Sequence, residues 1–209
     1  MSTVTRGTEK RIILSDVSWG TFLALSKEAR GGRLAYDQGQ LEIMSPSFEH
    51  ENIKGLIGRL VEVYTEELGV DMSSAGSTTL SREDLDRGIE PDECYYIAGA
   101  PQVRGKDSID LPVDPPPDLA IEVDISKPSV DKLGICAAIG IREVWRYDGS
   151  AVSIQILQDD GRYEQSTVSA VLSRFPFGQL NRILEERGSH SETQIARSFR
   201  QWIRDNLLA

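Results

Sequence analysis

Apolar side chains recur every three or four residues between Ser47 and Gly69, which is the spacing of one face of an α-helix. The stripe consists of Ile53, Leu56, Ile57, Leu60 and Tyr64. Ser45-Pro46-Ser47 would stop a preceding strand and start this helix, and a glycine such as Gly69 commonly ends one. The pattern predicts one long helix with a single buried face.

Shorter apolar stripes predict four further helices. Asp16 is placed to cap the first, which would end near Gly31-Gly32. Another is expected over 131–139, before Gly140. The segment 178–209 predicts the last two, with Ser191-Glu192-Thr193-Gln194 as a capping box before the second.

Runs of β-branched and alternating residues between turn signals predict strands. The strands are expected over 33–36, 40–44, 78–80, 93–97, 118–125, 143–147, 152–157 and 163–167. Asp37-Gln38-Gly39 would make the first two a hairpin, and residues 98–117 are expected to form a long Gly/Pro/Asp-rich loop. The order of elements fits an α/β or α+β fold, a mixed β-sheet flanked by helices. We expect one domain over 1–209, with a helix and hairpin in 12–46 and a helical segment in 178–209.

Length and composition narrow the class of protein. The chain has 209 residues, 39% of them hydrophobic, which is enough for one sizeable core. No apolar run approaches the ~18 residues that span a bilayer, and the N-terminal sequence lacks the apolar stretch of a signal peptide. Two cysteines make no disulfide framework. These features predict a soluble cytoplasmic protein without a membrane partner.

The negative charge is concentrated in one quarter of the chain. The formal net charge is −10, and residues 81–131 carry 13 acidic and 5 basic side chains. One interpretation is a solvated acidic loop. The other is a group of carboxylates that binds a hard divalent cation.

The strand predicted over 118–125 favours the second interpretation. Side chains alternate across a strand, so Asp118, Glu122 and Asp124 would share one face, with about 7 Å between Glu122 and Asp124 at ~3.3 Å per residue. Such a row is costly to bury without a cation, although an edge strand facing water would tolerate it. Asp92 opens a strand thirty residues earlier, and adjacent strands could present Asp92 and Glu122 to one ion.

Three other side chains are candidates for the same site. Lys132 falls in the first turn of the predicted helix 131–139, where it could extend into solvent or return toward Glu122. His50 begins the long helix and could reach a site beside Glu42, or remain on the surface. The sequence contains no phosphate-binding loop, no dinucleotide-binding glycine motif and no zinc-protease motif.

In order and spacing, these segments resemble the Uma-type restriction endonuclease family of the PD-(D/E)XK nuclease superfamily. The resemblance covers roughly residues 12–180 and is carried by five segments. They are Tyr36–Pro46 with His50, Pro91-Asp92, Pro117–Val123, Lys132 and Gly140–Trp145. The resemblance implies a restriction-endonuclease-like core with its site at the edge of two central strands.

The resemblance also implies residue roles. Asp92 and Glu122 match the acidic metal ligands, with the Val123 carbonyl and Asp124 as further candidates for Mg²⁺ or Mn²⁺. Asp124 occupies the position of the motif's lysine, and Lys132 matches the helix lysine that replaces it in this family. Glu42 and His50 match upstream positions that could complete the catalytic set.

Three hypotheses of function follow. The first is a Mg²⁺-dependent DNA endonuclease that hydrolyses phosphodiester bonds. The second is a non-enzymatic dimeric module of the same fold that binds DNA or protein, and the third is a metal-dependent hydrolase of a smaller phosphoester. In an acidic protein, DNA affinity would come from a homodimer or from local basic residues. The candidates are Arg174, Arg182, Arg197, Arg200 and Arg204.

Overall fold

Two β-sheets form the framework of the computed structural model, which describes residues 9–28, 32–126 and 129–209. One sheet has five strands in the order β1-β3-β2-β6-β5, and all neighbouring strands are antiparallel. Its strands are β1 (Lys10–Leu14), β2 (Arg33–Asp37), β3 (Gln40–Ser45), β5 (Leu80–Arg82) and β6 (Arg87–Ile89).

The second sheet has six strands in the order β11-β10-β9-β8-β7-β4. Only β8 and β9 are parallel neighbours, so the sheet is mixed. Its strands are β4 (Ser73–Ser74), β7 (Glu93–Tyr96), β8 (Leu119–Val123), β9 (Glu143–Tyr147), β10 (Val152–Leu157) and β11 (Tyr163–Ser166).

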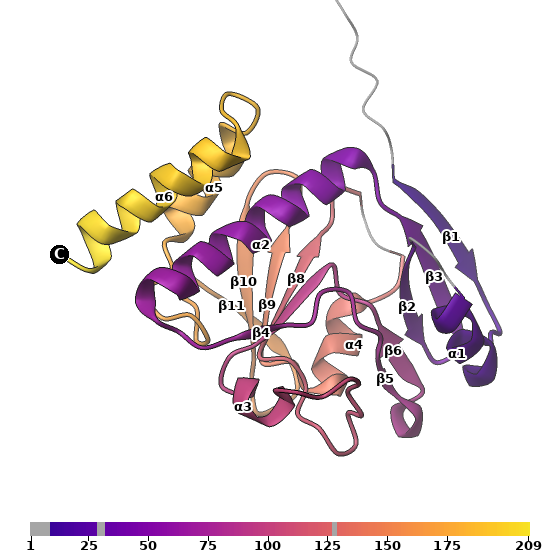
Figure 1. Cartoon of the computed structure of the whole chain (residues 1–209). Coiled ribbons are helices and arrows are strands. Elements are labelled where there is room, and N and C mark those ends of the chain that lie inside the picture. The colour runs from indigo at the N-terminus through magenta and orange to yellow at the C-terminus, as the bar shows by residue number, and fades with distance from the viewer. Residues whose placement is uncertain (1–8, 29–31, 127–128) are drawn as a thin grey trace, which may run out of the picture.

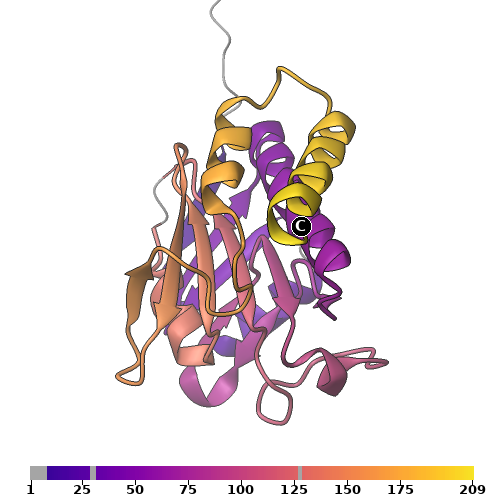
Figure 2. The ribbon, with the colours of Figure 1, turned by 90° about the vertical axis from the view of Figure 1, so that its left-hand side faces the viewer.

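Helices cover both sheets and separate them (Figure 1). They are α1 (Trp19–Glu28), α2 (Phe48–Leu68), α3 (Ala100–Val103), α4 (Lys132–Ile139), α5 (Phe177–Glu185) and α6 (Glu192–Leu207), with a 3₁₀ turn at Glu83–Leu85. Figure 2 shows α2 and α6 side by side on one face of the six-stranded sheet. Within the described ranges, none of the helices combines the length and apolar character needed to cross a membrane.

The alternation of β8 divides the core between its two faces, as the sequence predicts. Leu119, Ile121 and Val123 pack with the apolar residues of α2, α5 and α6. Ala120, on the other face, packs with residues of α4 and of the five-stranded sheet. Because β8 is buried on both faces, even-numbered side chains at its carboxyl end point into the space between the sheets.

Helix α4 occupies that space. Ile135, Cys136 and Ile139 lie in one apolar cluster with Ala35 of β2 and Ile89 of β6. On the far side of the five-stranded sheet, α1 covers Leu34 and Tyr36 with Phe22. Glycine is required where β6 passes under α1, because a Cβ at Gly88 would lie 2.4 Å from Cζ of Phe22.

The predicted α+β class is confirmed, and most predicted elements form. Helix α2 has Ser47 as its N-cap, which accepts from the His50 amide, and Gly69 ends it with a left-handed φ of 64°. The predicted cap of α1 is wrong, because Asp16 has a φ of 57° and the Ser18 hydroxyl accepts from the Thr21 amide instead. Gly31, at its expected end, lies outside the described residues.

Four short elements were not expected from the sequence, namely β1, β4, β6 and α3. They have two to five residues each, too few to display a period. Strand β1 in addition exposes its apolar residues. Together β1 and β6 extend the predicted hairpin into a second sheet, where the sequence predicted one mixed sheet.

Candidate functional site

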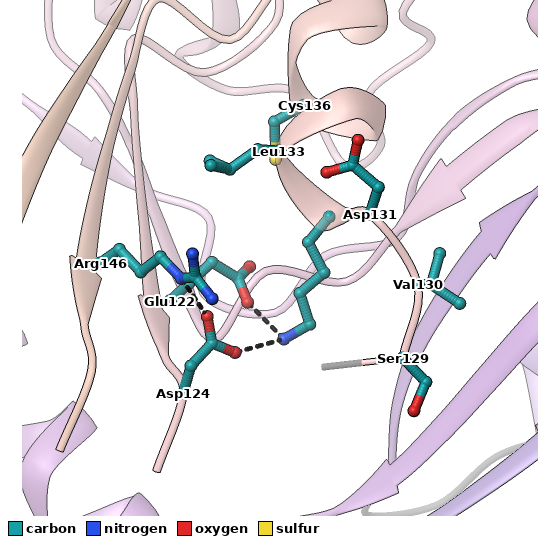
Figure 3. A pocket seen from close by; sticks show the side chains of 9 residues that line it. Glu122, Asp124, Ser129, Val130, Asp131, Leu133, Cys136 and Arg146 are labelled. Atoms are coloured by element: carbon teal, nitrogen blue, oxygen red, sulfur yellow. Dashed lines mark hydrogen bonds and ion pairs between the residues drawn. The ribbon is translucent and has the colours of Figure 1, made fainter. Parts of the chain in front are cut away.

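A pocket of about 300 Å³ opens where β8 ends and α4 begins, between the two sheets (Figure 3). Side chains from β8, β9, α4 and the segment before α4 line it. They are Glu122, Asp124, Ser129, Val130, Asp131, Lys132, Leu133, Cys136 and Arg146. Three predicted site residues, Glu122, Asp124 and Lys132, therefore meet at one pocket.

Lys132 and Glu122 form the central contact of the pocket. Nζ of Lys132 donates to Oε2 of Glu122 at 2.5 Å, and the two side chains are 8% and 2% exposed. Lys132 is the first residue of α4, after the N-cap Asp131, whose carboxylate accepts from the Gly134 amide. The helix start thus directs the lysine inward, as one of the two sequence interpretations proposed.

Asp124 extends the contact toward β9. Its Oδ1 lies 3.6 Å from Nζ of Lys132, and its Oδ2 accepts from Nε of Arg146 at 2.6 Å. Arg146 is opposite Glu122 in the parallel pairing of β8 with β9. One lysine therefore pairs with the carboxylate of Glu122 in β8 and with that of Asp124 just after the strand, and Asp124 also pairs with Arg146 of β9 (Figure 3).

Asp92 reaches the same end of β8 from the start of β7, the antiparallel neighbour of β8. Its Oδ2 accepts from the Val123 amide at 2.8 Å, and its Oδ1 accepts from Nε2 of His50 at 2.9 Å. Nε of Arg33 lies 3.8 Å from the same Oδ1. Asp92 is 1% exposed and His50 fully buried, so both side chains have fixed surroundings.

Glu42 lies further from this cluster. It is on the face of β3 opposite Leu41 and Ile43, which pack under α1. Its Oε2 accepts from the Ser129 amide at 2.6 Å, and its Oε1 pairs with the Arg11 guanidinium. In the described ranges no hydrogen bond or ion pair joins Glu42 to Asp92 or Glu122. Arg11 bonds both Glu42 and Glu9, and Glu9 in turn bonds His50 beside Asp92.

His50 is held at both ring nitrogens by carboxylates. Nε2 faces Asp92, and Nδ1 lies 2.7 Å from Oε1 of Glu9. Ionised carboxylates only accept hydrogen bonds, so both ring nitrogens carry hydrogen and the ring is an imidazolium. Burial alone would lower the pKa of His50, but the bonds to Asp92 and Glu9 raise it to about 9.

The carboxylates of the site differ in charge state. Burial raises the pKa of Glu122 to about 7, and the nearby charges of Asp92 and Asp124 act in the same direction against Lys132. Burial opposes ionisation of Asp92 too, but the His50 bond and the Lys132 charge lower its pKa overall. Burial would also lower the pKa of Lys132, yet Glu122, Asp92 and Asp124 raise it. The lysine stays protonated and Asp92 ionised at neutral pH.

Two oxygens suit these residues to a divalent cation. Oε1 of Glu122 and Oδ1 of Asp124 are buried and accept no hydrogen bond from the residues that the structure describes, an arrangement that is costly for an anion without a cation. Hard cations take carboxylate oxygens, so the donor set fits. Among the described residues, however, no group of three or more His, Cys, Asp or Glu side chains is arranged to hold a metal ion.

Of the predicted site residues, Asp92 thus contacts His50, and Lys132 contacts both Glu122 and Asp124. Glu42 lies at the edge of this group, bonded to Arg11 and to the Ser129 amide. Asp118, expected on the same face, lies at the other end of β8, where its carboxylate accepts from the amides of Ile97 and Gly99. Sequence reasoning missed four charged residues that contact the set: Glu9, Arg11, Arg33 and Arg146. Alternation along the hairpin and β9 could have indicated Arg33 and Arg146.

The arginines proposed for DNA contacts are largely engaged within the chain. Arg200 and Arg204 of α6 pair with Glu66 and Glu67 of α2, and Arg182 pairs with Glu186. These contacts neutralise much of the basic surface that the C-terminal helices would present.

Among solved structures, the chain is similar to "a putative nuclease belonging to DUF820" from Anabaena variabilis, at 16% identity and a TM-score of 0.45, over 80% of this chain and 90% of that one. No curated protein matches the chain. The Uma2 family model, described as "Putative restriction endonuclease", matches residues 19–186, which include every predicted site residue. Because that match spans most of the chain, the protein belongs to the Uma2 family.

Proposed function

We propose that the protein is a metal-dependent DNA endonuclease whose site is built on Asp92, Glu122 and Lys132. The observation that carries the proposal is the buried contact between Nζ of Lys132 and Glu122 at 2.5 Å, beside Asp92. Two carboxylates with an adjacent lysine can hold a cation and stabilise a charged phosphate. Family membership supports the same class of reaction.

The metal ligands in this proposal are Asp92 and Glu122, with Asp124 and the Val123 carbonyl as further candidates. Mg²⁺ or Mn²⁺, when bound, would activate a water molecule and neutralise charge that develops on the phosphate. Oε1 of Glu122 and Oδ1 of Asp124, which accept no hydrogen bond within the described part of the chain, are the atoms that a bound cation would satisfy.

The chain's own residues supply the remaining chemistry. The protonated amine of Lys132 would donate to an attacking water or to a phosphate oxygen, where a positive charge in a buried site has its largest effect. His50 keeps Asp92 ionised and fixed in orientation by donating to its Oδ1. Glu42, held by the Ser129 amide and Arg11, would shape the border of the site.

A plasmid cleavage assay tests the proposal. Wild-type protein should nick or cut DNA with Mg²⁺ or Mn²⁺ and be inactive with EDTA, and Glu122→Gln should be inactive with either metal. Glu164→Gln is the matched control, because it makes the same chemical change at an exposed position of β11 in the same sheet. Cleavage that survives in Glu122→Gln would point to a contaminant or another site.

One observation favours a second candidate, the non-enzymatic binding module. Each carboxylate of the region is already paired with a cation of the chain, as in Lys132 with Glu122 and Arg146 with Asp124. Carboxylates whose charge is already neutralised by such pairs could serve the stability of the fold alone. No cleavage of a varied DNA panel by metal-loaded protein would favour this module.

The homodimer stays a prediction, which sedimentation velocity would test.

A further inference from the structure

Strand β1 has an unusual distribution of buried and exposed side chains. Its apolar residues Ile12, Ile13 and Leu14 are 58%, 53% and 40% exposed. The charged side chains of Glu9, just before the strand, and Arg11 are only 2% and 11% exposed. This segment therefore buries the charged side chains of Glu9 and Arg11 and exposes its three apolar ones. Packing alone would select the reverse.

The carboxylate of Glu9 contacts three side chains. Its Oε1 lies 2.7 Å from Nδ1 of His50, and its Oε2 accepts from Arg11 at 2.9 Å and from the Ser126 hydroxyl at 2.5 Å. These bonds outweigh burial and lower the pKa of Glu9 to about 2. The carboxylate is thus an ion that fixes one nitrogen of the histidine bonded to Asp92.

A purely structural role accounts poorly for this arrangement. Burying ion pairs adds little net stability, because desolvation offsets most of the attraction. Main-chain pairing with β3 already holds β1 in the sheet. Glu9 and β1 also lie outside the residues matched by the family model, so no part of the family match assigns them a role.

We propose that Glu9 is a positioning residue of the site: its carboxylate fixes the His50 imidazole and, through it, the orientation of Asp92. The proposal rests on the proposed function in taking Asp92 as a metal ligand. Partners that orient ligand side chains typically affect metal affinity or activity by about 10–100-fold. Loss of Glu9 should therefore weaken the site without removing a ligand.

The first test observes His50 directly. The chain has two histidines, so long-range ¹H–¹⁵N spectra of histidine-labelled full-length protein contain two ring systems, and His190→Gln assigns them. Wild type should show a slowly exchanging Nδ1–H for His50. Glu9→Ala should lose that proton, whereas Lys10→Ala, at the exposed neighbouring position, should keep it.

The second test measures metal binding and cleavage. Calorimetric titration with MnCl₂ should show about tenfold weaker binding in Glu9→Ala and Glu9→Gln than in wild type and Lys10→Ala. DNA cleavage should fall by a similar factor in the two Glu9 variants. Glu9→Gln keeps the size of the side chain, and thermal melts of all variants confirm that folded proteins are compared.

The outcomes separate this inference from the proposed function. If wild type cleaves DNA but folded Glu9 variants match it in Mn²⁺ affinity and rate, the positioning role is overturned while the nuclease stands. If wild type does not cleave, the nuclease proposal fails and the spectra and Mn²⁺ affinities still decide the role of Glu9. A His50 Nδ1–H that persists unchanged in Glu9→Ala overturns the inference in either case.

Discussion

Nζ of Lys132 lies 2.5 Å from Oε2 of Glu122, although the two residues belong to different elements, the start of α4 and the end of β8. The start of α4 directs the lysine toward the end of β8. Asp124 occupies the position two residues after Glu122. The lysine beside Glu122 comes from α4 instead. The contact connects the geometry of the fold to the proposed chemistry.

The first prediction concerns the lysine. Lys132→Met should lower metal-dependent DNA cleavage by about 10²–10³, the usual cost of removing one donor that acts on developing charge. Metal affinity should be retained or increased, because the substitution removes a cation beside Glu122. Single-turnover cleavage and MnCl₂ titration measure the two effects. Equal cleavage rates in wild type and Lys132→Met would remove the lysine from the mechanism.

The second prediction concerns metal and stability. A ligand that binds only the folded state stabilises it by mass action, by about 2.7 kcal/mol at a hundred times its Kd. Millimolar Mg²⁺ or Mn²⁺ should therefore raise the melting temperature of wild type and of Glu164→Ala, and should not raise that of Glu122→Ala. Differential scanning calorimetry provides the comparison. An identical shift in Glu122→Ala would place the ion elsewhere.

The third prediction uses two glycines of α2. A Cβ at Gly55 meets no atom within 4 Å, whereas a Cβ at Gly58 would lie 2.9 Å from Oη of buried Tyr95. Gly55→Ala should stabilise the protein by about 0.5–1 kcal/mol through helix propensity. Gly58→Ala should destabilise it by about 1–3 kcal/mol through overpacking. Urea denaturation compares them, and equal stabilisation by both would contradict the packing described.

These residues also show what the sequence could predict. The ends of α2 were predictable because Ser47 and Gly69 act locally, through a side-chain cap and a left-handed turn. The two faces of β8 were predictable because alternation is a property of any strand. Asp92 and Glu122 were singled out by strand alternation and by their spacing along the sequence, and the structure brings them to one end of β8.

The contacts of Glu9 and Arg11 could not be predicted in the same way. Strand β1 pairs with β3, whose residues lie about thirty positions later, and its exposed apolar residues give no sign of which face is buried. The direction of Lys132 was likewise open, because a first-turn lysine can point either way. Such contacts depend on tertiary structure, which a local pattern does not encode.

The fourth prediction concerns acid stability and the turn between β9 and β10. Oδ1 of Asp148 accepts from the Ser150 hydroxyl and from the amides of Ser150 and Ala151. These bonds, the hydroxyl first, lower the pKa of Asp148 from 3.8 to about 2. A depressed pKa means that the folded state binds its proton less tightly than the unfolded state. The stabilisation is therefore complete above pH 3.8 and is lost as the pH falls through 2.

Asp148→Asn should remove this contribution while retaining an acceptor oxygen in the turn. Because Asp148 is largely exposed, solvent screening limits the effect to about 1 kcal/mol. The stability difference between wild type and Asp148→Asn should be greatest above pH 4 and shrink toward pH 2. Asp160→Asn, in the turn between β10 and β11, is the matched control, because among the described residues this aspartate accepts from the Arg162 amide alone. Urea denaturation at several pH values measures the difference, and one that stays constant from pH 5 to pH 2 would show that the Asp148 charge does not stabilise the turn.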